Sequence, residues 1–320
     1  MKSFIKQKIL KPIISIFQML VNKLTYNRIT DSGQFSNFNN VSNKYTEILN
    51  SFGPSVKPEE LSNGYFWEDW ILKISNSFKN QVSIKFLNQP EISYTMVFSH
   101  NNGFASAAKR INFLKKVFTD DVTRNLLRED FVGGPNIVSF EYLTSANRSH
   151  HAFHLARYTE LTSKKLWDTS SVLEFGGGYG NMARLLKKMN PELTYTIIDL
   201  PELLSLQYVY LGAIFGEEKI NCIFNKDQNI ASGKINLVPS SLVLNNDVSL
   251  MAESFISTWA VTESPKPFQD DVLRKEFFKA KNILIGSLVD SNNHLKNKIC
   301  KDFSIGQVQF LPKGHEYWVR

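Results

Sequence analysis

The residues of this sequence best placed to do chemistry form a glycine-rich turn. It follows the strand-like run Ser171–Phe175 and contains Gly176, Gly177, Gly178 and Gly180. Glycine adopts backbone angles that a Cβ blocks, and it lets a ligand contact the main chain. Asn181 then opens a pattern of apolar residues at helical spacing, so the turn joins a strand to a helix N-terminus. We therefore expect a ligand at this turn.

The spacing of the glycines distinguishes between two kinds of nucleotide. A dinucleotide site requires Gly-x-Gly-x-x-Gly with the pyrophosphate on the helix N-terminus, and here the third position is Asn181. Glu174, two residues before the first glycine, would repel a pyrophosphate and attract a cation. The pattern therefore favours a positively charged nucleoside without phosphate over a nicotinamide dinucleotide.

A second carboxylate occurs where the ribose of such a nucleoside would lie. Asp199 ends the strand-like run Thr194–Asp199, nineteen residues after Gly180. A carboxylate there can accept hydrogen bonds from both ribose hydroxyls. Leu200 then precedes Pro201, a residue suited to the first position of a helix.

Together these residues resemble motif I of the Rossmann-like methyltransferases. The resemblance implies that S-adenosyl-L-methionine, which carries an ammonium and a sulfonium group but no phosphate, binds at the turn. The expected cofactor-binding residues are Glu174, Gly176, Gly177, Gly178, Gly180, Asn181, Asp199, Leu200 and Trp259. Trp259 could stack on the adenine or on a sugar, and a place in the core is equally consistent with its type.

Two further segments, Asp199–Leu204 and Phe255–Pro265, resemble a narrower family, the sugar O-methyltransferases of natural-product and cell-surface polysaccharide pathways. The resemblance covers roughly the C-terminal half of the chain and the stretch just before it. It implies an S-adenosylmethionine-dependent O-methyltransferase that acts on a hydroxyl of a nucleotide-sugar or a glycan. The chain departs from this pattern at Glu253 and Ser254, where an Asp-Leu pair would open the fourth strand.

Methyl transfer to a hydroxyl needs a group that takes the proton as the new bond forms. His150, His151 and His154 cluster on a predicted helix just before the glycine turn, and histidine is the usual base near neutral pH. We expect one of the three to be the base if this helix covers the cofactor as a lid; ordinary polar helix residues are the alternative. Glu263, after the fourth strand, could orient a histidine or accept the proton, or it could simply begin a helix near Pro265.

Metal chemistry has little support in the sequence. Some sugar methyltransferases use Mg2+ to lower the pKa of the hydroxyl, but no tight carboxylate cluster here demands it, and we expect no metal site. His150 and His154 have the spacing of a helical metal pair, but no Glu lies between them as in a metalloprotease helix. Cys222 and Cys300 are too few for a disulfide framework, so we expect two reduced thiols.

Alternating strand-like and helical segments must position these residues. The strand-like runs are Ser171–Phe175, Tyr195–Asp199, Ile235–Val238, Phe255–Thr258 and Asn282–Leu288. Their alternation with helical segments indicates a parallel sheet with crossover helices. Ile305–Leu311 and Glu316–Arg320 flank Pro312-Lys313-Gly314, which predicts a hairpin. We therefore predict an α/β fold with a Rossmann-like methyltransferase sheet, mostly parallel and ending in an antiparallel hairpin.

The N-terminal half has a different pattern. We expect residues 1–160 to form a mainly helical region for substrate recognition, for a lid or for dimerisation, and residues 161–320 to form the Rossmann-like catalytic domain. Residues 28–64 are rich in Ser, Asn and Gly, which predicts a loop-rich connector. Residues 65–130 and Ser145–Leu161 carry helical patterns, separated by Gly133-Gly134-Pro135.

Composition and charge set outer limits on function. Hydrophobic residues make up 42% of the chain and charged residues 21%, as in a globular protein, and the net charge is +7. Lysines alternate with apolar residues near the N-terminus, and the apolar run that follows to Val21 lacks a signal-peptide cleavage site and is too short to span a bilayer. An amphipathic helix here would pack on its own domain or on a second copy in a homodimer, or would contact an anionic membrane surface. We expect a cytoplasmic protein, with peripheral contact at the inner membrane face as the alternative.

Other functions stay open at this point. An RNA methyltransferase would suit the positive charge, but the charge is dispersed without basic–aromatic interleaving, so nucleic acid is not the expected partner. Another small-molecule acceptor is compatible with the same cofactor motif. A non-catalytic methyltransferase-like binding module is a further alternative, and the presence of both Glu174 and Asp199 argues against it.

Overall fold

The computed structural model describes residues 28–53, 66–79, 81–97, 103–244, 248–288, 302–309 and 314–320, together with residues 20, 295, 296 and 298. Within these residues an eight-stranded sheet has the strand order β5-β6-β4-β3-β7-β8-β10-β9. Its strands are β3 Ser171–Phe175, β4 Thr194–Asp199, β5 Ile220–Cys222, β6 Ile235–Pro239, β7 Ser254–Thr258, β8 Asn282–Leu288, β9 Ser304–Gln307 and β10 His315–Val319.

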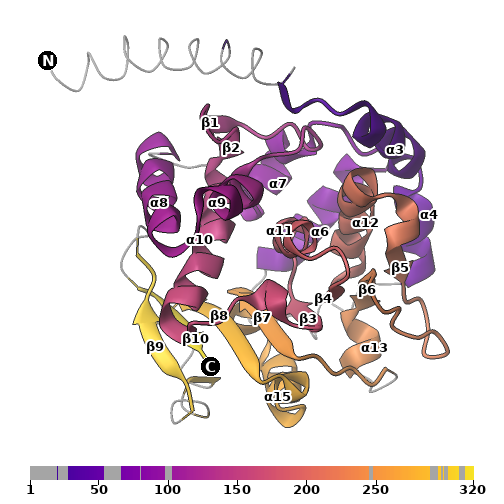
Figure 1. Ribbon diagram of the computed structural model, residues 1–320. Helices are drawn as coiled ribbons and strands as arrows, with labels where there is room; N and C mark the ends of the chain where they lie inside the picture. Colours follow the sequence, from indigo (N-terminus) through magenta and orange to yellow (C-terminus); the bar gives the residue numbers. More distant parts are fainter. Residues whose placement is uncertain are drawn as a thin grey trace, which may run out of the picture.

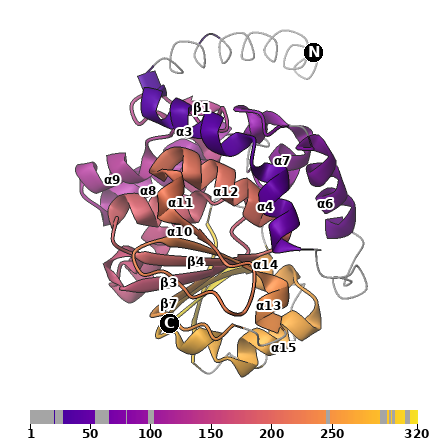
Figure 2. The ribbon, with the colours of Figure 1, turned by 90° about the vertical axis from the view of Figure 1, so that its right-hand side faces the viewer.

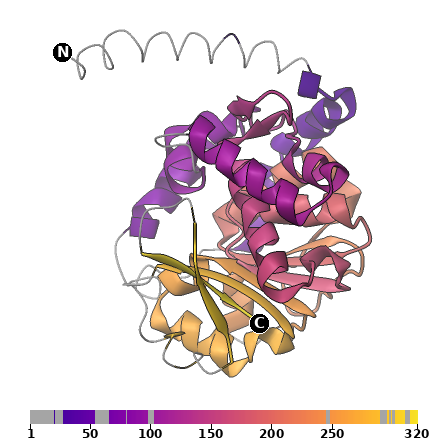
Figure 3. The ribbon, with the colours of Figure 1, turned by 60° about the vertical axis from the view of Figure 1, so that its left-hand side comes forward.

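The pairing of these strands confirms the predicted fold class. The pairs from β5 across to β8 are parallel, whereas β10 is antiparallel to both β8 and β9. Figure 3 shows this C-terminal hairpin in yellow beside the orange strands. The sheet is therefore Rossmann-like and mostly parallel, and it ends in the predicted antiparallel hairpin. The edge strand β5 was not predicted, because three residues are too few to show a strand pattern.

Helices cover both faces of the sheet (Figure 2). The helices that follow the strands are α11 Asn181–Met189, α12 Pro201–Phe215, α13 Ser240–Leu244, α14 Ala260–Glu263 and α15 Lys266–Arg274. Adjacent residues of β4 face opposite sides: Ile197 packs in the cluster that contains α11 and α12, and Ile198 packs in the cluster that contains α13 and α15. This apolar alternation on a parallel strand buries both faces of the sheet.

The N-terminal helices lie on the α11–α12 side (Figure 1). They are α3 Ser32–Ser42, α4 Tyr45–Phe52, α6 Phe66–Ser77, α7 Pro90–Thr95, α8 Gly103–Val117, α9 Asp120–Leu127 and α10 Ala146–Thr162. A short pair of strands, β1 Ile137–Ser139 and β2 Thr144–Ser145, lies between α9 and α10. The helical patterns predicted within residues 65–130 and 145–161 are confirmed for the part of the chain that is described.

The prediction of a loop-rich connector over residues 28–64 is wrong for its first part. Asp31 caps α3 by accepting hydrogen bonds from the backbone N–H groups of Gly33 and Gln34. Val41 of α3 then packs against Gly212 of α12, where a Cβ on the glycine would lie 3.3 Å from Val41. The polar residues that suggested a loop are thus a helix cap and an exposed helix face. Residues 54–64 lie outside the described part of the chain.

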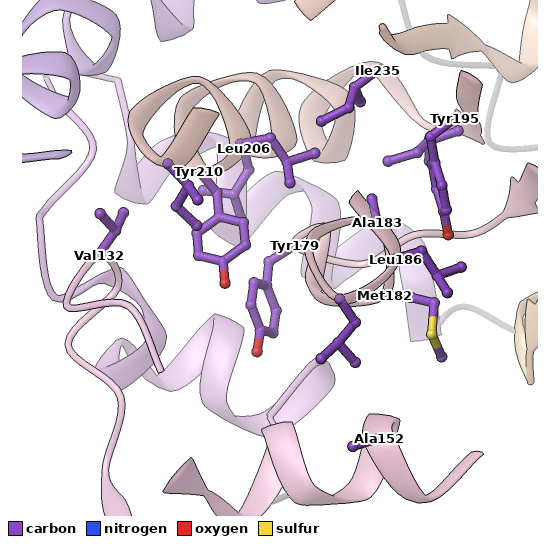
Figure 4. Packing of buried hydrophobic residues seen from close by; sticks show 14 of the residues in the cluster. Val132, Ala152, Tyr179, Met182, Ala183, Leu186, Tyr195, Leu206, Tyr210 and Ile235 are labelled. Carbon is purple, nitrogen blue, oxygen red and sulfur yellow. The ribbon is translucent and has the colours of Figure 1, made fainter. Parts of the chain in front are cut away.

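Helix α10 is an internal element and not an external lid. Twelve of its residues, from Ala146 to Tyr158, are buried, and it packs against α8 on one side and near α11 and β10 on the other. Figure 4 shows Ala152 of this helix in the same packed cluster as Met182 and Ala183 of α11. One apolar core therefore joins the N-terminal helices to the sheet.

Helical periodicity predicts that Arg184, Lys187 and Lys188 lie on the outer face of α11, opposite its apolar residues, but Arg184 and Lys187 are buried. Arg184 donates to Asp130 at 2.6 Å, and Lys187 donates to the carbonyl oxygens of Leu193 and Gly233, each at 2.8 Å. Lys188 is exposed. The prediction of an outer face is wrong because distant segments cover these two side chains: Asp130 of the N-terminal region pairs with Arg184, and the carbonyl oxygens of Leu193 and Gly233 surround Lys187.

The basic amphipathic segment predicted before Val21 lies outside the described residues, apart from Leu20. Among the helices that are described, none is long and apolar enough to cross a bilayer.

Candidate functional site

The sheet reverses its strand order between β3 and β7. From β3 the chain proceeds through β4 and β6 to one side, and through β7 and β8 to the other. In open α/β sheets, ligands bind outside the carboxyl ends of the strands at such a point. The glycine turn follows β3, and Trp259 follows β7, so both lie at this position.

The four glycines of the turn have different surroundings. A Cβ on Gly176, which has a φ of +79°, would lie 2.0 Å from the Cβ of Ala260, so this glycine is needed for close contact with the start of α14. A Cβ on Gly178 would meet nothing nearer than Met96, at 3.9 Å. Gly176 is thus required for packing, whereas a Cβ on Gly178 would make only an ordinary van der Waals contact with Met96.

Asp199 lies directly against this turn. Its carboxylate accepts hydrogen bonds from the backbone N–H of Leu200 at 2.9 Å and from the side-chain amide of Gln207 at 2.8 Å. The backbone N–H groups of Gly177 and Gly178 also donate to it. Burial raises the pKa of Asp199 to about 7, although these donors act in the opposite direction. Asp199 and the glycine turn are therefore adjacent, as the sequence predicts. Leu200, the residue that precedes α12, lies next to them.

Glu174 lies beneath the turn and not at its surface. It is 1% exposed and accepts a hydrogen bond from the hydroxyl of Tyr195 at 2.8 Å. Burial raises its pKa to about 8, the Tyr195 hydrogen bond lowers it, and nearby Asp199 raises it further. Two carboxyls with raised pKa values therefore lie next to each other under and beside the glycines, where a cation would favour their ionised forms.

Three buried amide and hydroxyl side chains complete this side of the site. Asn181 is fully buried at the start of α11, and neither polar atom of its side chain has a hydrogen-bond partner among the described residues. Gln207 donates from the same nitrogen to Asp199 and to the carbonyl oxygen of Gly178. Ser240, after the carboxyl end of β6, is 4% exposed with its hydroxyl also lacking a partner in the described chain. Gln207 and Ser240 were not predicted; a single glutamine inside the apolar pattern of α12 was the available signal.

On the other side of β3, the predicted histidines gather around Trp259. The rings of His150 and His154 lie 4.3 Å apart between centroids, and the ring of Trp259 lies 5.9 Å from His150 and 5.3 Å from His154. His151 is 5.8 Å from His154. Trp259 therefore belongs to the histidine cluster and lies across β3 from Asp199.

The backbone of Trp259 is unusual. Its φ is +70°, a region that L-residues with bulky side chains rarely adopt. The conformation is held by a hydrogen bond from its backbone N–H to the carbonyl oxygen of Gly286 at 2.8 Å, and the indole ring covers that glycine. Strained backbone of this kind is often found at functional sites.

The cluster also contains three residues that the sequence did not reveal. The indole Nε1 of Trp259 donates to Nδ1 of His315 at 3.0 Å, and Nδ1 of His154 is hydrogen-bonded to the hydroxyl of Tyr317. His315 and Tyr317 are two residues apart on β10 and so share the face toward α10. Arg110 of α8 is 1% exposed and donates to the carbonyl oxygen of Ala146 at 3.4 Å. The only feature of the sequence that points to any of these three residues is the alternation of side chains expected for a strand over residues 315–319.

Electrostatic effects keep these histidines neutral. Burial, followed by His154, Arg110, His151 and His315, lowers the pKa of His150 well below its ordinary value. Burial, followed by Arg148 and Arg110, lowers the pKa of His151 to about 3. Burial lowers the pKa of His154 likewise, followed by His151 and Arg110. The imidazoles are therefore unprotonated near neutral pH and retain a lone pair that can accept a proton.

Glu263, the remaining candidate base, ends the short helix α14 and is exposed. Its backbone N–H donates to the carbonyl oxygen of Trp259 at 3.0 Å. It is therefore linked through the backbone to Trp259, and although the residue is exposed overall, burial around its carboxyl raises its pKa. No group of three or more His, Cys, Asp or Glu side chains in the described chain is arranged to hold a metal ion.

Comparisons with known proteins concern the fold. No family model and no curated protein matches the chain, whereas 184 chains of solved structures do. The pyocyanin biosynthetic protein PhzM has 12% identity and a TM-score of 0.35 over 54% of this chain and 57% of that chain. An O-methyltransferase family 2 protein from Planctomyces limnophilus, solved with apigenin, has 11% identity and a TM-score of 0.35 over 53% of this chain and 57% of that chain.

The SAH-bound methyltransferase PaMTH1 from Podospora anserina has 10% identity and a TM-score of 0.35 over 71% of this chain and 92% of that chain. The chain thus spans little more than half the length of PhzM and of the Planctomyces protein. Likenesses this distant identify no activity, and the function has to be argued from the geometry of the site.

Proposed function

We propose that this protein is an S-adenosylmethionine-dependent O-methyltransferase that methylates a hydroxyl of a sugar. The observation that carries the proposal is the contact between Asp199 and the glycine turn. The carboxylate ends β4 next to the backbone N–H groups of Gly177 and Gly178, where the ribose of a nucleoside can be held. The residues at the turn are acidic and amide side chains, which suit a cation better than a phosphate.

The residues present fit S-adenosylmethionine. Gly178 is partly exposed at the turn, and Asn181 has two buried polar atoms without partners in the described chain. Glu174 and Asp199, whose pKa values are raised by burial, would be stabilised as carboxylates by a cation. When bound, S-adenosylmethionine supplies an electrophilic methyl group for in-line transfer. The turn, Asn181 and Asp199 would hold it by contacts to its amino-acid and ribose parts.

The histidine cluster is on the side where the acceptor would lie. Ala260, the residue after Trp259, touches the glycine turn at Gly176, so the cluster and the turn are neighbours in the fold. Trp259 offers an aromatic ring, partly exposed, against which a sugar can stack. His150, His151 and His154 are neutral and can accept the hydroxyl proton, with Glu263 as the exposed alternative.

The N-terminal half contributes to this acceptor side. Arg110 of α8 and the three histidines of α10 come from residues before 161, and β10 supplies His315 and Tyr317. We therefore assign acceptor recognition to residues 1–160 together with the C-terminal hairpin. The choice of a sugar as acceptor rests on the resemblance of the segments around Asp199 and Trp259 to sugar O-methyltransferases.

Calorimetric titration with S-adenosylmethionine and with its demethylated product tests the cofactor assignment. Both compounds are expected to bind. If neither titration gives heat, the enzymatic assignment is wrong and a methyltransferase-like binding module is left. Labelled S-adenosylmethionine can then be incubated with nucleotide-sugars, glycans, small phenols and RNA, followed by mass analysis of the products. Label in a sugar supports the proposal, whereas label in RNA or in a phenol alone would contradict the sugar assignment.

A further inference from the structure

We propose that Arg110, His150, His151, His154 and His315, gathered around Trp259, bind an oxyanion group of the methyl acceptor. The inference deepens the proposed function and rests on it, because it names the chemistry that the acceptor carries besides its hydroxyl. That chemistry is a phosphate diester, as in a nucleotide-sugar, or a carboxylate, as in a sugar acid.

The first argument is the set of polar atoms that the cluster leaves unsatisfied. His154 is fully buried, its Nδ1 is bonded to Tyr317, and its Nε2 has no hydrogen-bond partner among the described residues. Nδ1 of His151 likewise has no partner in the described chain. Buried polar atoms without partners are rare in proteins, and a bound ligand is one explanation of such atoms.

The tautomer of His315 adds a donor. An indole N–H can only donate, so the bond from Trp259 makes Nδ1 of His315 the acceptor. In the neutral ring, the proton of His315 is therefore on Nε2. His315 is partly exposed, so this N–H is placed where the cluster meets solvent. An oxyanion accepts such hydrogen bonds, and it accepts more strongly when the ring becomes charged.

The second argument is the sign of the local potential. The other charged and titratable groups that act on the three histidines come from α8, α10 and β10: they are Arg110, Arg148 and His315, together with Tyr317, which is hydrogen-bonded to His154. The Coulombic effects of their neighbours lower the pKa values of all three histidines. Burial lowers the pKa of Arg110 to about 10, so its guanidinium stays charged near neutral pH. The potential in the cluster is therefore positive, and it favours an anion over a neutral group.

Two other arginines near the cluster already have carboxylate partners. Arg148 forms an ion pair with Glu129 at 2.7 Å, with both side chains buried. Arg157 is paired with Glu160 on the same helix. Neither of these pairs would need to open for an oxyanion to bind next to Trp259.

The position of the cluster fits an acceptor site. Trp259 adjoins Ala260, which contacts Gly176 of the cofactor turn, so an anion on the acceptor would lie near its reacting hydroxyl. The anion would also raise the pKa values of the histidines, because a nearby negative charge favours the imidazolium. A histidine that is protonated in this way donates to the anion, whereas a histidine of the cluster that stays neutral keeps the lone pair that can accept the hydroxyl proton.

Calorimetry on the full chain tests this inference with three probes: uridine diphosphate glucose, glucuronate and glucose. The charges of the first two do not titrate near neutral pH, so any proton exchange belongs to the protein. Each titration is run at about pH 6 and at about pH 8, in two buffers of different ionisation enthalpy. At least one anionic probe is expected to bind with proton uptake that grows as the pH falls, whereas glucose gives no heat. The anion that binds identifies the source of the oxyanion.

The matched variants are Arg110→Gln and Lys109→Gln, which remove one positive charge from neighbouring positions of α8. Lys109 is exposed, so its loss is expected to leave anion binding unchanged, whereas loss of Arg110 lowers the affinity at least about tenfold. His154→Gln is expected to reduce the proton uptake. Equal effects of Arg110→Gln and Lys109→Gln would overturn the inference.

The wild-type titration decides the question even where a buried variant does not fold. Absence of heat with both anions, or binding without proton uptake, would overturn the inference. The same sample is titrated with S-adenosylmethionine. If that cofactor binds and neither anion does, the anion site is wrong and the proposed function stands; if the cofactor fails to bind, the proposed function itself is wrong.

Discussion

The side-chain amide of Gln207 donates one hydrogen bond to Oδ2 of Asp199 and another to the carbonyl oxygen of Gly178, both at 2.8 Å. Gln207 therefore ties the end of β4 to the glycine turn that follows β3. The backbone of Leu200 and of the turn supplies the other donors to Asp199. A ribose diol that binds to this carboxylate must replace some of these donors, so cofactor binding is coupled to a rearrangement at Gln207.

Removal of the carboxylate tests this arrangement directly. The variant Asp199→Ala is expected to lose about 10- to 100-fold in affinity for S-adenosylmethionine, since hydrogen bonds to a charged group contribute about 1.5 to 3 kcal/mol. Calorimetry measures the affinity, and Asp227→Ala, at an exposed acidic position, is the matched control. Equal affinity in the Asp199 variant and the control would show that the ribose is held elsewhere.

Cofactor affinity should depend on pH in a defined direction. Burial raises the pKa of Asp199 to about 7, so roughly half of these carboxyls carry a proton at neutral pH in the free protein. A cationic ligand and its ribose favour the carboxylate, so binding releases a proton. We therefore expect affinity for S-adenosylmethionine to rise from about pH 6 to about pH 9, as Asp199 and then Glu174 lose their protons, and to level off above that.

Calorimetry across this pH range in two buffers measures both the affinity and the released proton. Asp199→Asn should flatten the part of the pH profile that belongs to Asp199 and leave the part that belongs to Glu174, whose pKa is raised to about 8. Affinity that falls with rising pH would contradict the assignment of Asp199. The anion site predicts the opposite exchange, proton uptake, so the two ligands can be distinguished on one sample.

Alanine substitutions at Gly176 and Gly178 should affect protein stability and cofactor affinity differently. In Gly176→Ala the new Cβ would lie 2.0 Å from the Cβ of Ala260, at a φ of +79°, so we expect a loss of about 2 kcal/mol or more in the free energy of unfolding. In Gly178→Ala the nearest atom lies 3.9 Å away, and only the backbone strain of about 1 to 2 kcal/mol remains. The methyl group of the second variant is added at the partly exposed part of the turn, where we propose that the cofactor binds, and we expect weaker cofactor binding.

Thermal unfolding and calorimetric titration of the two variants measure these effects. The expected pattern is a large drop in melting temperature for Gly176→Ala and a smaller drop with weakened cofactor binding for Gly178→Ala. A Gly178→Ala protein that binds S-adenosylmethionine as the wild type does would show that the ligand does not approach this part of the turn.

The fold and the proximity of Asp199 to the glycine turn could be predicted because their signals are local. Each parallel strand is a short apolar run, and the turn between Phe175 and Asn181 carries four glycines in five positions. Asp199 follows from the same reasoning, since the strand after the turn pairs with β3. These features depend on neighbours in the chain, which a single sequence contains.

The acceptor half could not be predicted in the same way. Arg110, His154 and His315 come from α8, α10 and β10, and only the packing of these three elements brings them together. The helix α3 was missed for a related reason, because its polar residues resemble a loop until Val41 is seen packed on α12. Burial of Arg184 and Lys187 depends on groups supplied by distant segments, which helical periodicity does not contain.

A buried ion network should set the acid stability of the protein. Asp130 is 5% exposed and binds Arg184 of α11 at 2.6 Å, while its other oxygen accepts a hydrogen bond from Gln34 of α3 at 2.8 Å. Burial alone would raise the pKa of Asp130, but Arg184 and Arg148 outweigh it and lower the pKa to about 2. A carboxyl whose folded pKa is depressed stabilises the protein above its unfolded pKa, near 4, and loses that contribution as the pH falls toward 2. The stabilisation that is lost is expected to be about 2 kcal/mol.

Denaturant unfolding at a series of pH values measures this loss. In Asp130→Asn the free energy of unfolding should be lower by about 3 kcal/mol at neutral pH, because Arg184 loses its buried partner, and the difference from the wild type should shrink below about pH 4. A difference that stays constant from neutral pH to about pH 2 would show that Asp130 does not titrate as the network requires.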